Sequence, residues 1–304
     1  MTSRAKTILT VDSFYSRAKE LRAHFDEVFS DPRAARADRF IWDYWHVPDQ
    51  YTTLRTPAYH FFPKKLYEDF HNYLVWWGRR ELGCHDISPP WMSCYVDGCF
   101  QDIHGDLPHG PWAYVFSLTP WRGRKFTGGE TYLMREEILH YWKNFDPRNG
   151  LEREQVFQEI QPLFNRLTVF DPRIPHGVRE VRGVRDVREG RLVIHGWFVQ
   201  PRPFIEGPLS AGELQTRIDD LSEELEKLFM QGLSVHGVLS VRFKVSPRGL
   251  VTDAKTLSNS IRHPEGDRRV ERALTRHIEK IVKGFQFKAR KNASTVTLPL
   301  IFES

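Results

Sequence analysis

The strongest constraint on the fold is a change of hydrophobic pattern at Pro90. Before this residue, apolar side chains recur at helical spacing over residues 12–30 and over about 64–82. After it, short runs of β-like composition are separated by turn signals such as Gly128-Gly129. These runs are 91–96, 112–119, 130–134, 166–171 and 191–199. The pattern predicts an α+β protein whose core is a double-stranded β-helix, or jelly roll, backed by N-terminal helices.

The segments between these elements carry weaker signals. The first helix is predicted to begin at Asp12 or Ser13, because either residue is a good N-cap. Residues 40–59 read as an aromatic-rich loop, whose rings either line a substrate mouth or close the core, and the aromatic segment is taken as 42–62. A helical insert over about 136–164 interrupts the strands. We expect the aromatic segment and the insert to shape the choice of substrate.

A second, smaller unit is predicted at the C-terminus. Residues 200–212 are rich in Pro and Gly and predict a linker. The elements that follow are a helix (213–230), two strands (238–246 and 250–257), a helix (about 266–283) and a last strand (294–302). The sequence therefore predicts two domains, 1–205 and 206–304.

Composition excludes several classes of protein. The chain has 304 residues and a net charge of +5, which is too weak to indicate a nucleic-acid partner. Its three cysteines form no CxxC pair and do not suit a disulfide framework. We find neither an apolar leader nor an apolar run of about 18 residues. We therefore expect a cytoplasmic protein without a membrane span.

The sequence His104-Gly105-Asp106 provides the first candidate metal ligands. It follows a predicted strand and turn, and in an extended chain residues i and i+2 point to the same side. An imidazole and a carboxylate placed in this way form two thirds of a two-His, one-carboxylate iron site. The motif is short and occurs by chance. A second copy, His24-Phe25-Asp26, lies at helical spacing and is interpreted as helix surface.

Two later residues suggest how that site is completed. His176 follows an apolar strand and the turn Asp171-Pro172; it is either a third ligand or a hydrogen-bonded structural histidine. On the next strand, alternation places Arg191 on the same face as His195 and Trp197. If that face is interior, the buried cation needs an anion, and a bound carboxylate fits its guanidinium.

The ordered set of motifs resembles the Fe(II)- and 2-oxoglutarate-dependent dioxygenases, in particular the prolyl-hydroxylase-like branch, over about residues 90–200. The motifs are Tyr95, His104-x-Asp106, Gly128-Gly129-Glu130, His176 and Arg191-x4-Gly196-Trp197-Phe198. The resemblance implies that His104, Asp106 and His176 hold iron. It further implies that Arg191 binds the C5 carboxylate of 2-oxoglutarate, with Tyr95 and Ser117 assisting.

The resemblance also implies the reaction. Fe(II), 2-oxoglutarate and O2, with ascorbate as an optional reductant, would hydroxylate a C–H bond and release succinate and CO2. The substrate would be a peptidyl or prolyl residue or a small molecule, and its identity is not predicted. Asp106 argues against halogenation, because related halogenases lack this carboxylate.

One departure from the family pattern concerns the arginine. The gap between His176 and Arg191 is longer than the family's usual gap of about ten, and it contains Arg182, Arg185 and Arg188. We prefer Arg191, since it alone precedes the apolar Gly-Trp-Phe strand. The other three are expected to lie on an exposed hairpin.

Other readings remain open at this point. The C-terminal unit weakly resembles the αββαβ domain of TonB-type energy transducers and is either a binding or dimerisation module or a packing appendage. The whole chain is alternatively a catalytically inactive jelly-roll binding protein whose C-terminal module recruits a partner. A cupin-like metal site without cosubstrate is a third reading, but it leaves Arg191 without an anion.

Overall fold

The computed structural model describes residues 7–31, 33–34, 42–107, 109–148 and 150–303. The chain divides into two compact units. One comprises Ile8–Leu74 and Ile87–Val199, and the other is formed mainly by Val75–Asp86 and Gln200–Ser304. The division near residue 200 lies close to the predicted boundary at 205/206, whereas the inclusion of residues 75–86 in the C-terminal unit was not predicted.

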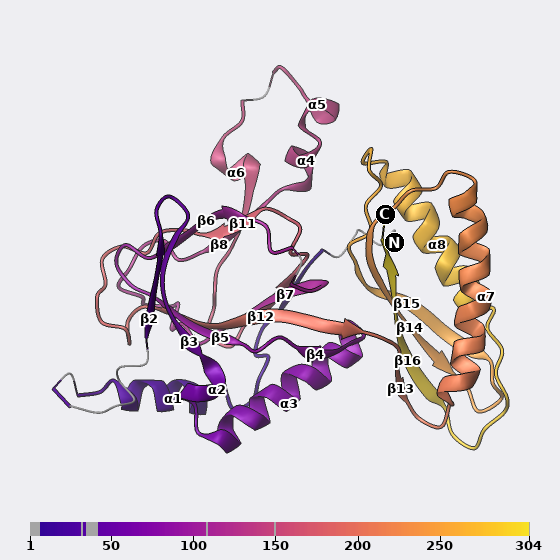
Figure 1. Cartoon of the computed structure of the whole chain (residues 1–304), viewed down its shortest axis with the longest axis horizontal. Coiled ribbons are helices and arrows are strands. Elements are labelled where there is room, and N and C mark those ends of the chain that lie inside the picture. The colour runs from indigo at the N-terminus through magenta and orange to yellow at the C-terminus, as the bar shows by residue number, and fades with distance from the viewer. Residues whose placement is uncertain (1–6, 32, 35–41, 108, 149, 304) are drawn as a thin grey trace. The chain divides into compact units, whose positions relative to one another are not determined.

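The first unit is built on a curled antiparallel sheet of the jelly-roll type (Figure 1). In spatial order its strands are β1 (Ile8–Val11), β10 (Leu167–Phe170), β7 (Trp112–Ser117), β12 (Arg191–Pro201), β5 (Trp91–Tyr95), β3 (Tyr51–Pro57), β6 (Phe100–His104), β11 (His176–Val178), β8 (Thr131–Met134) and β9 (Phe157–Ile160). In addition, β2 (Asp43–Val47) pairs with β3, and β4 (Cys84–Ile87) pairs with β12. All five strands predicted after Pro90 are confirmed, together with the α+β jelly-roll class.

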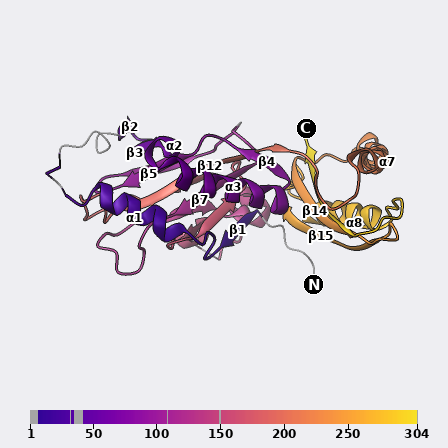
Figure 2. The ribbon, with the colours of Figure 1, turned by 90° about the horizontal axis from the view of Figure 1, so that it is seen from below.

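Two helices lie along one face of this sheet, as Figure 2 shows. They are α1 (Ala18–Val28) and the first part of α3 (Lys64–Glu81). Phe14, which precedes α1, and Phe70 on α3 both pack against Phe116 of β7, with ring centroids 5.8 and 4.9 Å apart. The apolar side chains at helical spacing are therefore core, as predicted.

The predicted start of the first helix is wrong. Ile8–Val11 form strand β1, Ser13 has a φ of 53°, and the helix begins only after Arg17. A residue with positive φ breaks the helical path, so Ser13 serves the turn between strand and helix rather than a cap.

The aromatic segment between the helices is not a loop. Its described part forms the hairpin β2–β3, followed by the short helix α2 (Ala58–Phe61); residues 40–41 lie outside the described residues. Asp49, with a φ of 58°, occupies the hairpin turn. This hairpin brings a whole strand, β3, into the centre of the sheet beside β5.

The insert after β8 is also less helical than predicted. It contains three helices of four residues, α4 (Glu136–Leu139), α5 (Tyr141–Asn144) and α6 (Arg153–Val156), and then strand β9. Asp146-Pro147 and Asn149-Gly150 fall between α5 and α6, and such pairs favour turns over helix. Figure 1 shows the insert projecting from the end of the sheet that carries β8.

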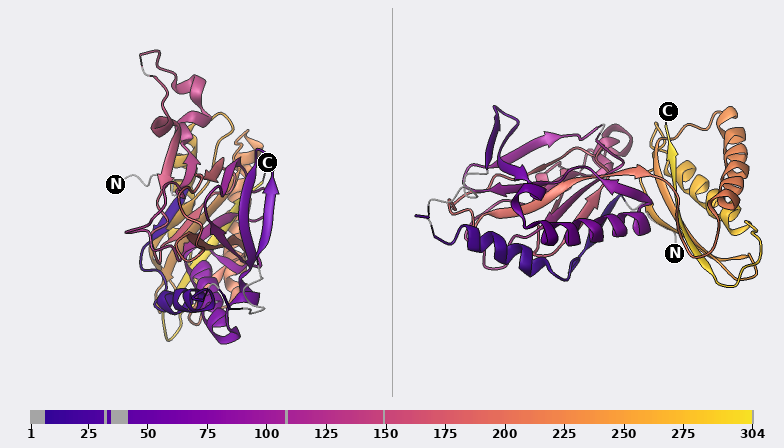
Figure 3. Two further views of the ribbon diagram at one scale, coloured as in Figure 1. Left: turned by 90° about the vertical axis from the view of Figure 1, so that its left-hand side faces the viewer. Right: turned by 60° about the horizontal axis from the view of Figure 1, so that its bottom comes forward.

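From α7 onward, the C-terminal unit has the predicted αββαβ order. Its elements are β13 (Phe204–Glu206), α7 (Ala211–Met230), β14 (Gly237–Val245), β15 (Val251–Asn259), α8 (Arg268–Lys283) and β16 (Ser294–Phe302). The sheet order is β13-β16-β14-β15, and the apolar sides of α7 and α8 cover it (Figure 3). The predicted linker is therefore partly wrong, because β12 extends to Pro201 and β13 joins this sheet.

No helix in the described ranges has the length and apolar character needed to cross a membrane.

Candidate metal centre

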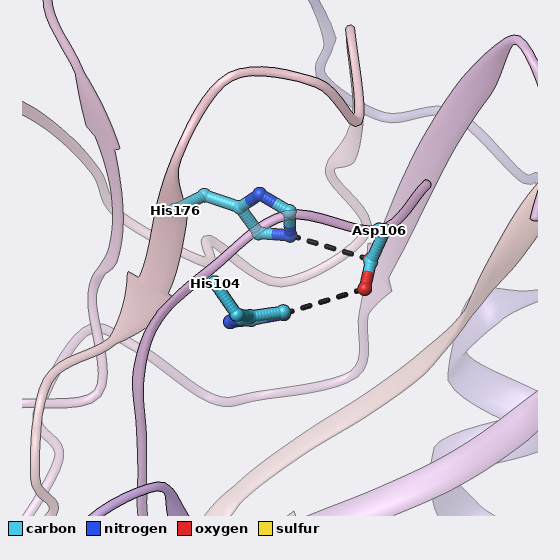
Figure 4. Close-up of side chains that lie close together, drawn as sticks. All are labelled: His104, Asp106 and His176. Atoms are coloured by element: carbon cyan, nitrogen blue, oxygen red, sulfur yellow. Dashed lines mark ion pairs between the residues drawn. The ribbon is translucent and has the colours of Figure 1, made fainter. Parts of the chain in front are cut away.

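The structure brings His104, Asp106 and His176 together (Figure 4). His104 ends β6, His176 begins β11, and the two residues are directly paired in the register of these antiparallel strands. Asp106 reaches the same point two residues after His104. Its Oδ1 lies 3.4 Å from His104 Nε2, and its Oδ2 lies 3.3 Å from His176 Nε2. The three ligand atoms thus face one point, as a shared metal ion requires.

Both imidazoles are oriented by the main chain. Nδ1 of His104 donates to the carbonyl of Asp102, and Nδ1 of His176 donates to the carbonyl of Ile174, each at 2.8 Å. These bonds assign the proton to Nδ1 and leave the Nε2 lone pair directed at the shared point, as in histidines that ligate metals. The Gln101 amide lies 3.1 Å from His104 Nε2, and a metal ion bound at that nitrogen would replace this contact.

The three residues also favour a charged carboxylate. Burial opposes charge on Asp106, but hydrogen bonds with His104 and His176 outweigh it and hold the pKa of Asp106 well below its usual value. Burial by itself lowers the pKa of His104, yet the hydrogen bond with Asp106 raises it overall. A carboxylate that stays ionised beside two imidazoles is suited to a divalent cation.

Arg191 is an interior cation with unused hydrogen-bonding capacity. Only 1% of the residue is exposed, and its guanidinium carbon lies 4.6 Å from the centroid of the Tyr95 ring. Its Nη2 donates to Thr131 Oγ1 at 3.1 Å, whereas Nε and Nη1 have no hydrogen-bond partner among the described residues. Burial lowers the pKa of Arg191. Unpaired buried donors on a cation form a ready site for an anion.

The two residues expected to assist Arg191 have different surroundings. Tyr95 stands next to it in the paired strands β5 and β12 and lines the same cavity. Ser117 does not line that cavity: its Oγ donates to the carbonyl of Pro162 at 2.7 Å and accepts from the amide of Thr119 at 3.1 Å. The hydroxyl that contacts the arginine belongs instead to Thr131, which the sequence reasoning missed.

The alternative arginines lie elsewhere. Arg182 is exposed and pairs with Glu180 at 2.6 Å, and Arg188 pairs with Asp186 at 2.8 Å. Arg185 is exposed as well. Their segment is an irregular loop rather than a hairpin, and its Val181 and Val184 turn inward to the core while the arginines turn outward.

The metal-ligand candidates and Arg191 line one cavity of about 480 Å³. Its wall follows the paired strands β3, β5 and β12, and inward side chains alternate along each strand. His195 lies on this wall, and its Nε2 is 2.8 Å from Ser93 Oγ. Burial, reinforced by Arg191, lowers the pKa of His195 to about 4. The ring is therefore neutral near pH 7.

Comparison with known proteins identifies the class of enzyme. Residues 90–199 match the sequence model of the 2OG-Fe(II) oxygenase superfamily. The match covers 110 of the 304 residues. The matched residues contain the three metal-ligand candidates and Arg191. The chain is thus a 2-oxoglutarate-dependent oxygenase, an enzyme that uses Fe(II), 2-oxoglutarate and O2.

Solved structures of similar proteins include hydroxylases. A prolyl-4-hydroxylase from Pseudomonas putida is 16% identical, with a TM-score of 0.42, over 64% of this chain and 92% of its own. A prolyl hydroxylase from Trichoplax adhaerens, in complex with a hypoxia-inducible-factor peptide fragment, is 15% identical, with a TM-score of 0.43, over 64% and 84%. No curated protein matches the sequence.

Proposed function

We propose that this 2OG-Fe(II) oxygenase hydroxylates a C–H bond of a bound substrate, with release of succinate and CO2. The observation that carries the proposal is the position of Arg191. A fully buried guanidinium with two unpartnered nitrogens lies in the same cavity as a His-Asp-His cluster. A dicarboxylic keto acid has one end for the metal and another for the arginine.

In this proposal, His104, Asp106 and His176 hold the Fe(II) ion. Two neutral imidazoles and one carboxylate are a donor set that suits non-haem Fe(II) and leaves coordination positions open for other ligands. The main-chain carbonyls of Asp102 and Ile174 keep both rings in the metal-binding tautomer.

Arg191 binds the C5 carboxylate of 2-oxoglutarate through one edge of its guanidinium, in which Nε or Nη1, neither of which has a hydrogen-bond partner among the described residues, acts together with the second N–H of Nη2. A guanidinium grips a carboxylate bidentately, and the pair is strong where water is excluded. Thr131 Oγ1 accepts the first N–H of Nη2, and the Tyr95 ring packs against the guanidinium. Ser117 has no part in this arrangement, because its hydroxyl is engaged with the main chain away from the cavity.

When held by these residues, Fe(II) would supply with O2 the oxidation of 2-oxoglutarate to succinate and CO2, with one oxygen atom entering succinate and the other the substrate. The protein positions the cosubstrate and the substrate and shields them from water. Tyr95 and Val193 pack in one apolar cluster. The Phe170 ring contacts the His176 ring in an edge-to-face arrangement, with ring centroids 4.7 Å apart. This enclosure keeps water from the cosubstrate's carboxylate and strengthens its pairing with Arg191.

Binding and turnover together test the proposal. Titration of 2-oxoglutarate into the Mn²⁺-loaded protein should give one site per chain, and this site should be absent from the Arg191→Met variant. With Fe(II) and O2, succinate release should rise when free amino acids, peptides or a cell extract provide a substrate. A wild-type protein that binds neither metal nor 2-oxoglutarate would contradict the proposal.

For the C-terminal unit we propose a binding or dimerisation role. Its edge strand β15 has only β14 as a strand partner in the described part of this sheet, and a free edge suits the addition of another strand. The mass of the full chain in solution, measured by light scattering over a range of concentrations, tests self-association. A strictly monomeric chain would restrict the role to another partner.

A further inference from the structure

The cavity contains a second arginine whose charge is not neutralised. Arg55 lies on β3 and lines the same cavity as Arg191. Its guanidinium carbon is 3.3 Å from the centroid of the Trp45 ring and 4.3 Å from that of Trp91. The buried Nε has no hydrogen-bond partner, and no ion pair of this side chain occurs among the described residues. Burial lowers the pKa of Arg55, and Asp43, which lies opposite in the strand register, opposes this electrostatically without coming within ion-pair distance.

The lack of an ion-pair partner distinguishes Arg55 from most other arginines that pack on aromatic rings. Four of them have a carboxylate within ion-pair distance: Arg22 with Asp26, Arg80 with Glu206, Arg124 with Glu130, and Arg153 with Glu159. In the described part of the chain, the two ring-packed arginines without such a partner are Arg55 and Arg191, and both line the cavity. The two ring-packed arginines that lack a protein carboxylate are therefore the two that face the ligand cavity.

The two arginines belong to different strands of the cavity wall. Arg191 pairs with Tyr95 in the register of β12 and β5, whereas Arg55 pairs with Ser93 in the register of β3 and β5. Arg55 thus stands two strands across and two residues along from Arg191, a Cα separation of roughly 12 Å from standard strand spacings. One cation can serve the cosubstrate and the other a second molecule.

The surroundings of Arg55 favour a carboxylate as its partner. Its guanidinium packs against two indole rings and lacks a protein partner at Nε, and the in-plane N–H groups of a guanidinium match a planar carboxylate. The described cavity lining contains Arg55 and Arg191 but no lysine, and it also contains Asp49 and Asp102, so with Arg191 assigned to the cosubstrate Arg55 is the one arginine left for the second molecule. A phosphate dianion is normally bound by several donors or cations together.

We propose that Arg55 binds a carboxylate of the substrate to be hydroxylated, and that this substrate is a small carboxylic acid or free amino acid rather than an internal residue of a peptide. The inference rests on the function proposed above, because it takes Arg191 and the metal as the cosubstrate's partners. Trp91 and Trp197, which line the cavity, supply apolar surface for the rest of such a molecule.

The test compares acids with their amides. Full-length protein loaded with Mn²⁺ and 2-oxoglutarate is screened by thermal shift and calorimetry against free L-amino acids and their N-acetyl derivatives, each beside its carboxamide. Wild type should bind at least one acid tenfold or more tightly than the matched amide. Arg55→Gln should remove this preference, and Arg55→Lys should keep part of it. Arg124→Gln is the matched control, since Arg124 packs on Trp121 but already faces Glu130.

The outcomes separate this inference from the proposed function. Binding of 2-oxoglutarate to Arg55→Gln should stay within twofold of wild type, which also shows that the variant is folded. If 2-oxoglutarate binds normally but no acid in the panel is preferred over its amide, or if Arg55→Gln keeps the preference, the inference is wrong. Tighter binding of glycerol phosphate than of every carboxylate would overturn the choice of carboxylate. Failure of wild type to bind 2-oxoglutarate would instead remove the proposed function.

Discussion

His104 and His176 face each other across the paired strands β6 and β11, with imidazole centroids 4.4 Å apart. The register shifts immediately afterwards, because Val178 pairs with Gln101 rather than with Asp102. A bulge of this kind redirects side chains and is frequent beside active sites. A slip of one residue would turn one imidazole to the opposite face of the sheet.

Replacing a metal ligand should abolish metal binding and turnover. We expect His104→Ala, Asp106→Ala and His176→Ala each to weaken Mn²⁺ affinity by at least about 100-fold, because outer-shell changes alone cost 10- to 100-fold. Calorimetry measures the affinity, and succinate release should fall to background. A variant that still binds one metal ion per chain with wild-type affinity would remove that residue from the site.

Replacing Arg191 should chiefly affect the cosubstrate. Loss of one partner from a buried charge pair costs about 2–5 kcal/mol, so Arg191→Met should raise the KM for 2-oxoglutarate by at least about 30-fold. Arg182→Met and Arg188→Met are matched controls, since these side chains pair with Glu180 and Asp186 outside the cavity. A larger effect in either control than in Arg191→Met would move the role to that arginine.

His195 should make the folded protein sensitive to acid. Its pKa in the folded chain is about 4, below the ordinary value of 6.5, so the unfolded chain takes up a proton first as the pH falls. The associated stability is present above pH 6.5 and is lost between pH 6.5 and 4, by up to about 3 kcal/mol. Urea denaturation of wild type and His195→Gln across this range measures the difference. Parallel pH profiles would show that His195 contributes nothing.

Gly128 should be far less replaceable than Gly123. Both have φ near +77°, but a Cβ at Gly128 would lie 1.8 Å from the carbonyl oxygen of Glu180, whereas nothing lies within 4 Å at Gly123. We expect Gly128→Ala to destabilise the protein by at least about 2 kcal/mol more than Gly123→Ala. Thermal melting of both variants tests this, and equal melting temperatures would contradict it.

The sequence predicted the strands of the central sheet because their side chains are buried in long apolar runs, as in β7, β10 and β12. It missed β2 and β6, whose residues are mostly exposed or half-buried and show no alternation. The insert around α5 was overestimated as helix, because apolar residues such as Trp142 and Phe145 are exposed rather than packed on one face. Hydrophobic periodicity reflects which side chains are buried, so it does not predict helices or strands whose side chains are exposed.

Only those residues of the candidate site that follow a local sequence pattern could be predicted. His104-x-Asp106 and the face of β12 that carries Arg191 follow from alternation along a strand. Thr131 could have been suggested only by its position after Gly128-Gly129, and its contact with Arg191 joins residues 60 apart in the chain. The sequence did not indicate Arg55, because strand β3 was not predicted and the rings that contact Arg55 lie on two other strands.

The unpartnered nitrogens of Arg191 have a consequence for the survival of the protein in a cell. A buried cation without its counterion weakens the native state, and a keto acid that binds only the native state restores that loss. Chains short of this metabolite should open more often and be degraded sooner by proteases. The supply of the cosubstrate would then set the abundance of the enzyme as well as its rate.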